Sequence, residues 1–210
     1  MHDQANTIDA FLNAAAAKQP APGGGSVAAL AGALAASMGE MVLNYSVGKK
    51  SLAAHEPALR EALAEFTRAR RLLLSLMVED QVAYEALTAA RKLPESCVTR
   101  KSDCDVALLA SIRVPQAVGS TALAMIELAE RLVDQVNHFL LSDLAVCCEL
   151  AMATVRCAAY NVRANLPDLK DPKDRTDVEQ TAQRLTERGV SVIQRTIPRI
   201  WSRHASSITT

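Results

Sequence analysis

Apolar residues recur every three or four positions along most of this chain, which is the spacing of one face of an α-helix. Near the start, Ile8, Phe11, Leu12 and Ala15 fall on one such face. No run of alternating apolar and polar residues marks a β-strand. The pattern therefore predicts an all-α protein, a single-domain bundle of about six helices.

Prolines, glycines and polar runs divide the pattern into segments. The predicted helices are 7–18, 27–47, 57–93, a stretch from about 105 to 136 with a kink or restart at Pro115, 142–166, and 177–203. Ser26 and Ser142 are the expected N-cap residues of the second and fifth helices. The third helix is unusually long, which suits the spine of a bundle or a subunit interface. No linker or repeat divides the chain, so residues 1–210 are expected to form one domain.

The second predicted helix consists mainly of small residues. Gly32 and Gly39 lie inside it, although glycine costs about 1 kcal/mol relative to alanine in a helix interior. Close approach of another helix is the expected reason. Aromatic residues make up only 3% of the chain, so the core must pack backbone close to backbone rather than ring on ring.

Charge and cysteine content narrow the class of protein. The chain has 23 Lys and Arg against 23 Asp and Glu, so no global basic field is available to gather nucleic acid. The five cysteines include no C-x-x-C pair and are expected to be reduced and buried. The first residues do not read as a signal peptide, and the most apolar stretch, 27–43, is short for a membrane span and contains Glu40. We expect a cytoplasmic protein without nucleic-acid or membrane partners.

A glycine-rich motif opens the second predicted helix, with Gly23, Gly24, Gly25 and Ser26 following a proline. Consecutive glycines let a ligand approach the backbone, and a helix N-terminus offers free N–H groups. A flexible turn explains the glycines equally well. The motif is not a nucleotide-binding P-loop, which needs Lys and Ser or Thr directly after the glycines.

Two further polar groups are candidates for a site. Asp80 and Tyr84 are four residues apart on one face of the third helix, where a carboxylate and a phenol can transfer protons. A solvated Asp above a core Tyr is the alternative. Asn44, Lys49 and Lys50 lie at the end of the second helix, where they can bind a carboxylate tail; alternatively the lysines simply complement the helix dipole.

The last group consists of Asn137, Ser142, Asp143, Asn161 and Asn165. Asp143 and Asn161 are eighteen residues apart, or about five helical turns, so they share one face of the fifth helix. Asparagine is a mediocre helix former, and a polar stripe on an apolar helix needs partners. A structural and a functional role both stay open. The four histidines lack metal-ligand spacing, so no metal is expected.

These motifs together resemble the C-terminal family of formiminotransferase-cyclodeaminase, which includes stand-alone bacterial methenyltetrahydrofolate cyclohydrolases. The similarity begins with 20–36, 41–44 and 48–50. It continues through Asp80, Tyr84, Leu93-Pro94, Val114-Pro115, Asn137, Ser142-Asp143, Asn161-Val162 and Asn165-Leu166.

The resemblance implies an all-helical homodimer with folate near the subunit interface. It also implies one of two reactions: hydrolytic opening of methenyl-tetrahydrofolate to formyl-tetrahydrofolate, or loss of ammonia from formimino-tetrahydrofolate with ring closure. A chain without a formiminotransferase domain favours the first. No tightly bound cofactor is expected, because the tetrahydrofolate derivative is the substrate. A non-catalytic protein that binds folate or serves assembly is the alternative.

Roles for the candidate residues follow from this resemblance. Asp143 is expected to be a proton shuttle or pterin anchor, with Asp80 and Tyr84 nearby as catalytic residues. The glycine turn would cradle the substrate, and Lys49 and Lys50 would attract its glutamate tail. The remaining residues expected to bind substrate are Ser26, Asn44, Asn137, Ser142, Asn161 and Asn165. This interpretation requires the glycine turn and the Asp–Asn stripe to meet in one polar cleft, within a subunit or across two.

Overall fold

Residues 7–208, the part of the chain that this computed structural model describes, contain helices and turns but no strand. The α-helices are α1 (Ile8–Ala16), α2 (Gly24–Asn44), α3 (Glu56–Lys92), α4 (Arg100–Leu132), α5 (Leu141–Asn165) and α6 (Pro172–Ile208). Short 3₁₀ turns are η1 (Lys50–His55), η2 (His138–Leu140) and η3 (Leu166–Asp168). The prediction of an all-α fold with six helices is confirmed.

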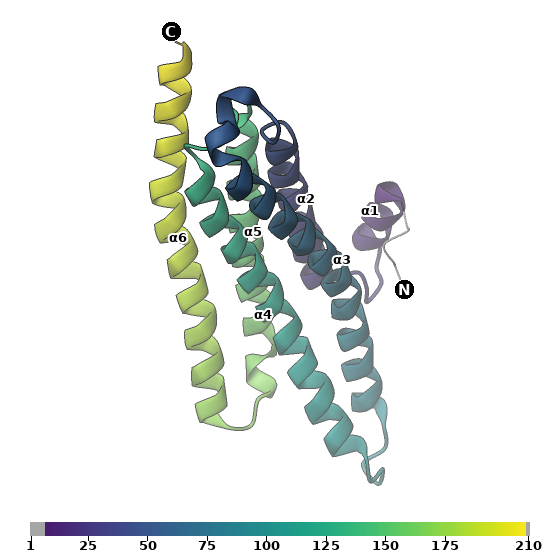
Figure 1. Ribbon diagram of the computed structural model, residues 1–210. Helices are drawn as coiled ribbons and strands as arrows, with labels where there is room; N and C mark the ends of the chain where they lie inside the picture. The colour runs from purple at the N-terminus through teal and green to yellow at the C-terminus, as the bar shows by residue number, and fades with distance from the viewer. Residues whose placement is uncertain (1–6, 209–210) are drawn as a thin grey trace.

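Helices α2, α3, α4 and α5 form the central bundle, with each helix antiparallel to the one before it. Contacts join α2 to α3, α3 to α4, α4 to α5 and α5 back to α2. Helix α6 lies along α5 and α4, while α1 stands to one side of the bundle (Figure 1). The start of α2 therefore lies beside the end of α5, and the end of α2 lies beside the start of α5.

Close helix packing explains the glycines inside α2. A Cβ atom on Gly39 would lie 2.5 Å from the ring of Phe66 in α3. A Cβ atom on Gly32 would lie 3.1 Å from both Leu73 in α3 and Thr154 in α5. The predicted close approach of a neighbouring helix is confirmed, and two helices approach rather than one.

Two predicted N-caps are wrong. Helix α2 begins at Gly24, three residues earlier than predicted, with Gly23 rather than Ser26 at the N-cap. Ser26 is fully buried in the first turn, where its side chain hydrogen-bonds to α3 instead. Helix α5 begins at Leu141 with Leu140 at the N-cap, because the turn η2 runs directly into it. Ser142 therefore lies inside the first turn.

Helix α4 runs unbroken through Pro115, so of the predicted kink or restart the restart is wrong. An internal proline removes one backbone hydrogen bond, and in α4 both Val114 and Pro115 are buried against the bundle. The loop predicted for 93–105 is also shorter, since α4 already begins at Arg100.

The five cysteines are free thiols, and their burial differs. Cys147 and Cys148 are buried, and burial raises the pKa of Cys148 to about 12. Cys97 and Cys104 are half-buried. Cys157 is exposed on the outer side of α5, so the expectation that the cysteines are buried is wrong there.

Helices α2 and α5 share an outer apolar surface, which we call the α2/α5 face. Its members are Val27, Ala31, Leu34, Met38, Met41, Val146, Leu150, Ala153, Cys157 and Tyr160. Leu34, near the middle of the face, is 50% exposed, and Val146, near one end of it, is 46% exposed.

By length and composition alone, three helical segments are apolar enough to cross a membrane, and the bundle buries about half of each. On α2, the apolar residues of the α2/α5 face extend from Val27 to Met41.

Candidate functional site

A polar pocket of about 300 Å³ opens where α2 begins, between the end of α5 and the second half of α3. We call it the glycine pocket. Its lining residues are Pro20, Ala21, Gly23, Gly24, Gly25, Asp80, Gln81, Tyr84, Leu87, Thr88, Arg91, Ser111, Asn161, Ala164 and Asn165. The pocket thus combines the predicted glycine turn, the predicted Asp–Tyr pair and two of the predicted asparagines.

Asp80 lies directly against the first turn of α2. Its Oδ2 atom is 3.0 Å from the hydroxyl of Ser26. A Cβ atom on Gly25 would lie 2.0 Å from its Oδ1 atom, so any larger residue there would force Asp80 to move. Helix α2 has no capping side chain of its own at Gly23, and Asp80 supplies an acceptor to it from α3. The carboxylate is fixed by the same contact that starts the helix.

Burial raises the pKa of Asp80 above its ordinary value of 3.8, and hydrogen bonds from the hydroxyl and backbone N–H of Ser26 partly offset this. The Ser26 hydroxyl also lies 3.1 Å from the carbonyl oxygen of Met77. A hydroxyl has one proton to donate. Ser26 can donate a hydrogen bond to ionised Asp80, or donate to the Met77 carbonyl and accept a hydrogen bond from the O–H of neutral Asp80. Both protonation states are accommodated, as a general acid–base group requires.

The opposite wall comes from the last turns of α5. Asn161 reaches toward Gly24, where a Cβ atom would lie 3.2 Å from the Asn161 Oδ1 atom. Its Nδ2 atom donates to the carbonyl of Cys157, which fixes the amide orientation. Asn165 donates through Nδ2 to the carbonyls of Ser111 and Asn161, and so ties α5 to α4. Asn161 can present its oxygen to a ligand, whereas Asn165 positions the wall.

The other predicted residues lie at the opposite end of the bundle. This second cluster comprises Asn44, Lys49, Lys50, Asn137, Ser142 and Asp143. Asp143 and Asn161 are eighteen residues apart on α5, which is about 27 Å along the helix axis. Within one subunit, Asp143 therefore lies far from Asp80 and Tyr84, so the cleft that the sequence interpretation allowed within a subunit or across two does not form within one subunit. The length of α5 separates the two clusters, and antiparallel packing places the start of α2 at the Asn161 end.

Asn137 organises the second cluster. Its backbone N–H donates to the hydroxyl of Ser46, its Nδ2 donates to the carbonyl of Tyr45, and its Oδ1 accepts from the N–H of Phe139. Asn137 is only 5% exposed, so its amide holds the turn against the end of α2. The Lys49 ammonium lies 5.8 Å from the centre of the exposed Phe139 ring. This end of the bundle therefore presents a cation and an aromatic ring to solvent.

Sequence reasoning missed four polar residues of the glycine pocket: Gln81, Thr88, Arg91 and Ser111. Thr88 and Arg91 continue the helical face that begins with Asp80 and Tyr84, so extending that face by two turns would have found them. Ser111 comes from α4, and only the tertiary structure brings it to this site.

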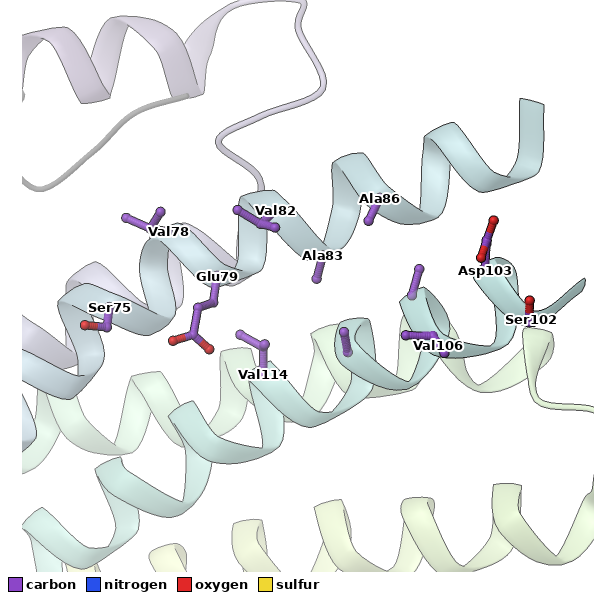
Figure 2. Close-up of a pocket in the computed structure, with 12 residues that line it drawn as sticks. Ser75, Val78, Glu79, Val82, Ala83, Ala86, Ser102, Asp103, Val106 and Val114 are labelled. Carbon is purple, nitrogen blue, oxygen red and sulfur yellow. The ribbon is translucent and has the colours of Figure 1, made fainter. Parts of the chain in front are cut away.

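A larger hollow, a groove of about 1050 Å³, lies between α3 and α4. Figure 2 shows Glu79 reaching from α3 toward Val114, with Ser102 and Asp103 at the far end. Alanine and valine make up most of the remaining lining. Because its few polar groups do not converge, we assign the chemistry to the smaller glycine pocket. Within residues 7–208, no three His, Cys, Asp or Glu side chains gather as a metal site would require.

Comparisons with known proteins identify the family of this chain. A family model described as formiminotransferase-cyclodeaminase matches residues 7–184. Methenyltetrahydrofolate cyclohydrolase of Methylorubrum extorquens is 34% identical over 169 residues, which cover 79% of this chain and 81% of that protein. Formimidoyltransferase-cyclodeaminase of Gallus gallus is 31% identical over 184 residues, which cover 86% of this chain but only 34% of that longer protein.

The fold has also been seen in a solved structure. Formiminotetrahydrofolate cyclodeaminase from Thermotoga maritima superposes with a TM-score of 0.85 at 24% identity, covering 97% of this chain and 98% of that chain. Fold, pocket and relatives together define an enzyme class that acts on one-carbon units carried by folate. The chain belongs to the formiminotransferase-cyclodeaminase family.

Proposed function

We propose that this protein is a methenyltetrahydrofolate cyclohydrolase, which opens methenyl-tetrahydrofolate with water to give formyl-tetrahydrofolate. The observation that carries the proposal is a partly buried carboxylate, Asp80, fixed against a glycine turn and facing the Asn161 amide in one pocket. Similarity to the Methylorubrum enzyme over most of its length supports the choice of reaction. The expected cytoplasmic location stays a prediction.

The proposed chemistry needs only water and a group that moves protons. The water oxygen attacks the carbon that bridges two folate nitrogens, and Asp80 takes one proton from it. One carbon–nitrogen bond then breaks, its electron pair stays on nitrogen, and that nitrogen takes the proton from Asp80. The carbon keeps the oxygen as a formyl group, and the second water proton passes to solvent. Backbone N–H groups at the start of α2 and the Asn161 amide orient the pterin, with Tyr84 at the pocket edge.

We further propose that the active enzyme is a homodimer formed through the α2/α5 face. An apolar surface that runs the length of two helices is unfavourable in water, and a second copy covers it best because the face carries polar groups at both ends. A two-fold axis in the plane of the face, at right angles to the helices, places each glycine pocket under the second cluster of the partner subunit.

This arrangement would reunite the predicted site residues. Asp143, Lys49 and Lys50 of one subunit would lie over Asp80 and the glycine turn of the other. A two-fold axis parallel to the helices would instead stack like clusters on each other and leave both sites incomplete. The antiparallel dimer therefore explains why one helix, α5, carries polar residues at two ends about 27 Å apart.

A two-substrate assay tests the reaction. Purified protein is expected to convert methenyl-tetrahydrofolate to formyl-tetrahydrofolate faster than the uncatalysed rate, measured by loss of methenyl absorbance. Formimidoyltetrahydrofolate cyclodeaminase is the second candidate, favoured by the Gallus and Thermotoga relatives. Faster ammonia release from formimino-tetrahydrofolate would select it. Folate binding by calorimetry without turnover of either substrate would select a non-catalytic protein.

Mixing inactive subunits tests the shared site. Asp80→Asn and Asp143→Asn homodimers are each expected to be inactive. Their heterodimer pairs intact Asp80 with intact Asp143 in one of its two sites, so refolding an equal mixture should restore about a quarter of wild-type activity. Mixing Asp80→Asn with Tyr84→Phe is the control. Both changes fall in the same half-site, so no pairing of these subunits creates an intact site, and the mixture should show only the average activity of the two variants. Failure of the first mixture to recover activity would refute the composite site.

A further inference from the structure

Arg91 stands at the outer end of the glycine pocket, on the same face of α3 as Asp80. Asp80, Tyr84, Thr88 and Arg91 follow one another at helical spacing and all line the pocket. Asp80 and Arg91 are eleven positions apart, which corresponds to about 16 Å along the helix axis. The pocket is therefore elongated along α3, with a carboxylate at its inner end and a guanidinium at its rim.

The two ends of the pocket carry opposite charge. Among the described residues that line it, Asp80 is the one acid and Arg91 the one base. Arg91 pairs with Asp168 in η3, with 2.5 Å between Nη2 and Oδ2, and both side chains are about half exposed. An ion pair this exposed contributes little to stability, and a ligand carboxylate can share or replace the Asp168 contact. A guanidinium also carries five donors, enough for two carboxylates at once.

We propose that Arg91 binds a carboxylate of the glutamate attached to the folate substrate and so sets the preference for glutamylated substrate. The inference rests on the proposed function. Methenyl-tetrahydrofolate has a positive one-carbon bridge and a negative glutamate, separated by a rigid benzoyl group. With the bridge at Asp80 and the glutamate at Arg91, both charges of the substrate meet a complementary partner within one subunit. Arg91, rather than Lys49 or Lys50 of the partner subunit, then takes the first glutamate.

Substrates with and without glutamate test this assignment. Arg91→Gln is expected to raise KM for methenyl-tetrahydrofolate roughly tenfold, the usual size for a lost charge-assisted contact, with kcat within about twofold of wild type. KM for methenyl-tetrahydropteroate, which lacks the glutamate, should not change. Arg91→Lys should restore part of the affinity, since a lysine keeps the charge but not the planar fork.

Control variants separate a specific contact from general electrostatics. Lys92→Gln removes the neighbouring cation, which is exposed and does not line the pocket, and should leave both KM values unchanged. Asp168→Asn removes the competing carboxylate and should lower KM for the glutamylated substrate or leave it unchanged.

Three outcomes are distinguishable. An Arg91→Gln effect of equal size on both substrates, or on neither, overturns the inference while leaving the proposed function intact. The inference is also overturned if Lys49→Gln, but not Arg91→Gln, raises KM only for the glutamylated substrate. The glutamate would then bind at the second cluster. Absence of turnover by the wild-type protein with every folate tested refutes the proposed function itself, and the inference with it.

Discussion

At the start of α2, the carboxylate of Asp80 has both a structural and a proposed catalytic role. Asp80 supplies an acceptor to a helix that lacks a capping side chain, and it lines the glycine pocket beside Asn161. Gly25 makes this possible, since any larger residue would occupy the space of the Asp80 Oδ1 atom. The glycine run is thus not merely a flexible turn, because one of its members is required by packing against a partly buried acid.

Replacing Asp80 with Asn separates its structural role from its proposed role in proton transfer. Asn keeps the shape and an acceptor oxygen but cannot carry a proton, so kcat should fall about 100-fold or more. The raised pKa of Asp80 means that the folded protein binds this proton more tightly than the unfolded chain. Wild-type stability relative to Asp80→Asn should therefore be greatest below pH 3.8 and decline as the pH rises through the raised pKa. Urea unfolding between pH 3 and 7 measures this, and a difference that grows with pH would contradict it.

Two alanine substitutions in the same turn distinguish packing from flexibility. Gly25→Ala forces Asp80 to move and should cost about 1–3 kcal/mol in the free energy of unfolding, with a large loss of kcat/KM. Gly23→Ala meets no atom within 4 Å and should cost less than about 1 kcal/mol. Urea denaturation and steady-state kinetics of both variants provide the measurement. Equal effects would mean that the turn acts only through its flexibility.

At the scale of whole helices, small residues determine how near α2 and its neighbours lie. Gly39 faces the ring of Phe66, and Gly32 faces Leu73 and Thr154. These contacts fix the rotation of α2 about its axis. That rotation in turn directs Gly24 toward Asn161 and Gly25 toward Asp80, so the packing along α2 places the pocket at its end.

A double-mutant cycle tests the contact between α2 and α3. Gly39→Ala would put a methyl group 2.5 Å from the Phe66 ring and should destabilise the protein by about 1–3 kcal/mol. In a Phe66→Leu background, the smaller side chain leaves room, so the same change should cost at least about 1 kcal/mol less. The free energy of unfolding in urea gives all four corners of the cycle. Strict additivity would show that the two helices do not meet at this pair.

At the scale of the molecule, the arrangement of its surfaces supports the proposed dimer. The α2/α5 face runs between the glycine pocket at one end and the second cluster at the other. Asp143 lies about 27 Å along α5 from Asn161, which lines the same pocket as Asp80. In an antiparallel dimer, each end of the face would complete a site.

A charged residue on the α2/α5 face tests this arrangement. Leu34→Glu buries a carboxylate in the proposed interface, so the protein should sediment as a monomer and lose turnover while keeping its far-UV helical signal. Leu72→Glu is the matched control, since Leu72 is 46% exposed against 50% for Leu34 and lies on α3 away from the face. It should remain dimeric and active. A monomeric wild-type protein at micromolar concentration, with normal turnover, would refute the dimer.

How much of the site the sequence predicts depends on the range of the interactions involved. Asp80 and Tyr84 are one helical turn apart on the same helix, so their spacing in the sequence was enough to predict that they share a face. Ser26 was predicted to cap its own helix, yet it contacts Met77 and Asp80, which lie more than fifty residues away. Arg91 and Ser111 were missed because one lies two turns beyond the predicted pair and the other lies on a different helix.

The sequence alone determined the helices, nearly to the residue for α3 (Glu56–Lys92 against 57–93), because periodicity and proline stops act over a few residues. It also determined which polar residues stand out on apolar helices. The tertiary structure decided which of them meet. Asn161 and Asp143 lie about 27 Å apart on one helix, and the antiparallel packing of α5 against α2 decides that Asn161 rather than Asp143 lies beside the glycine turn. Proximity between helices depends on packing across the whole bundle, and no local pattern encodes it.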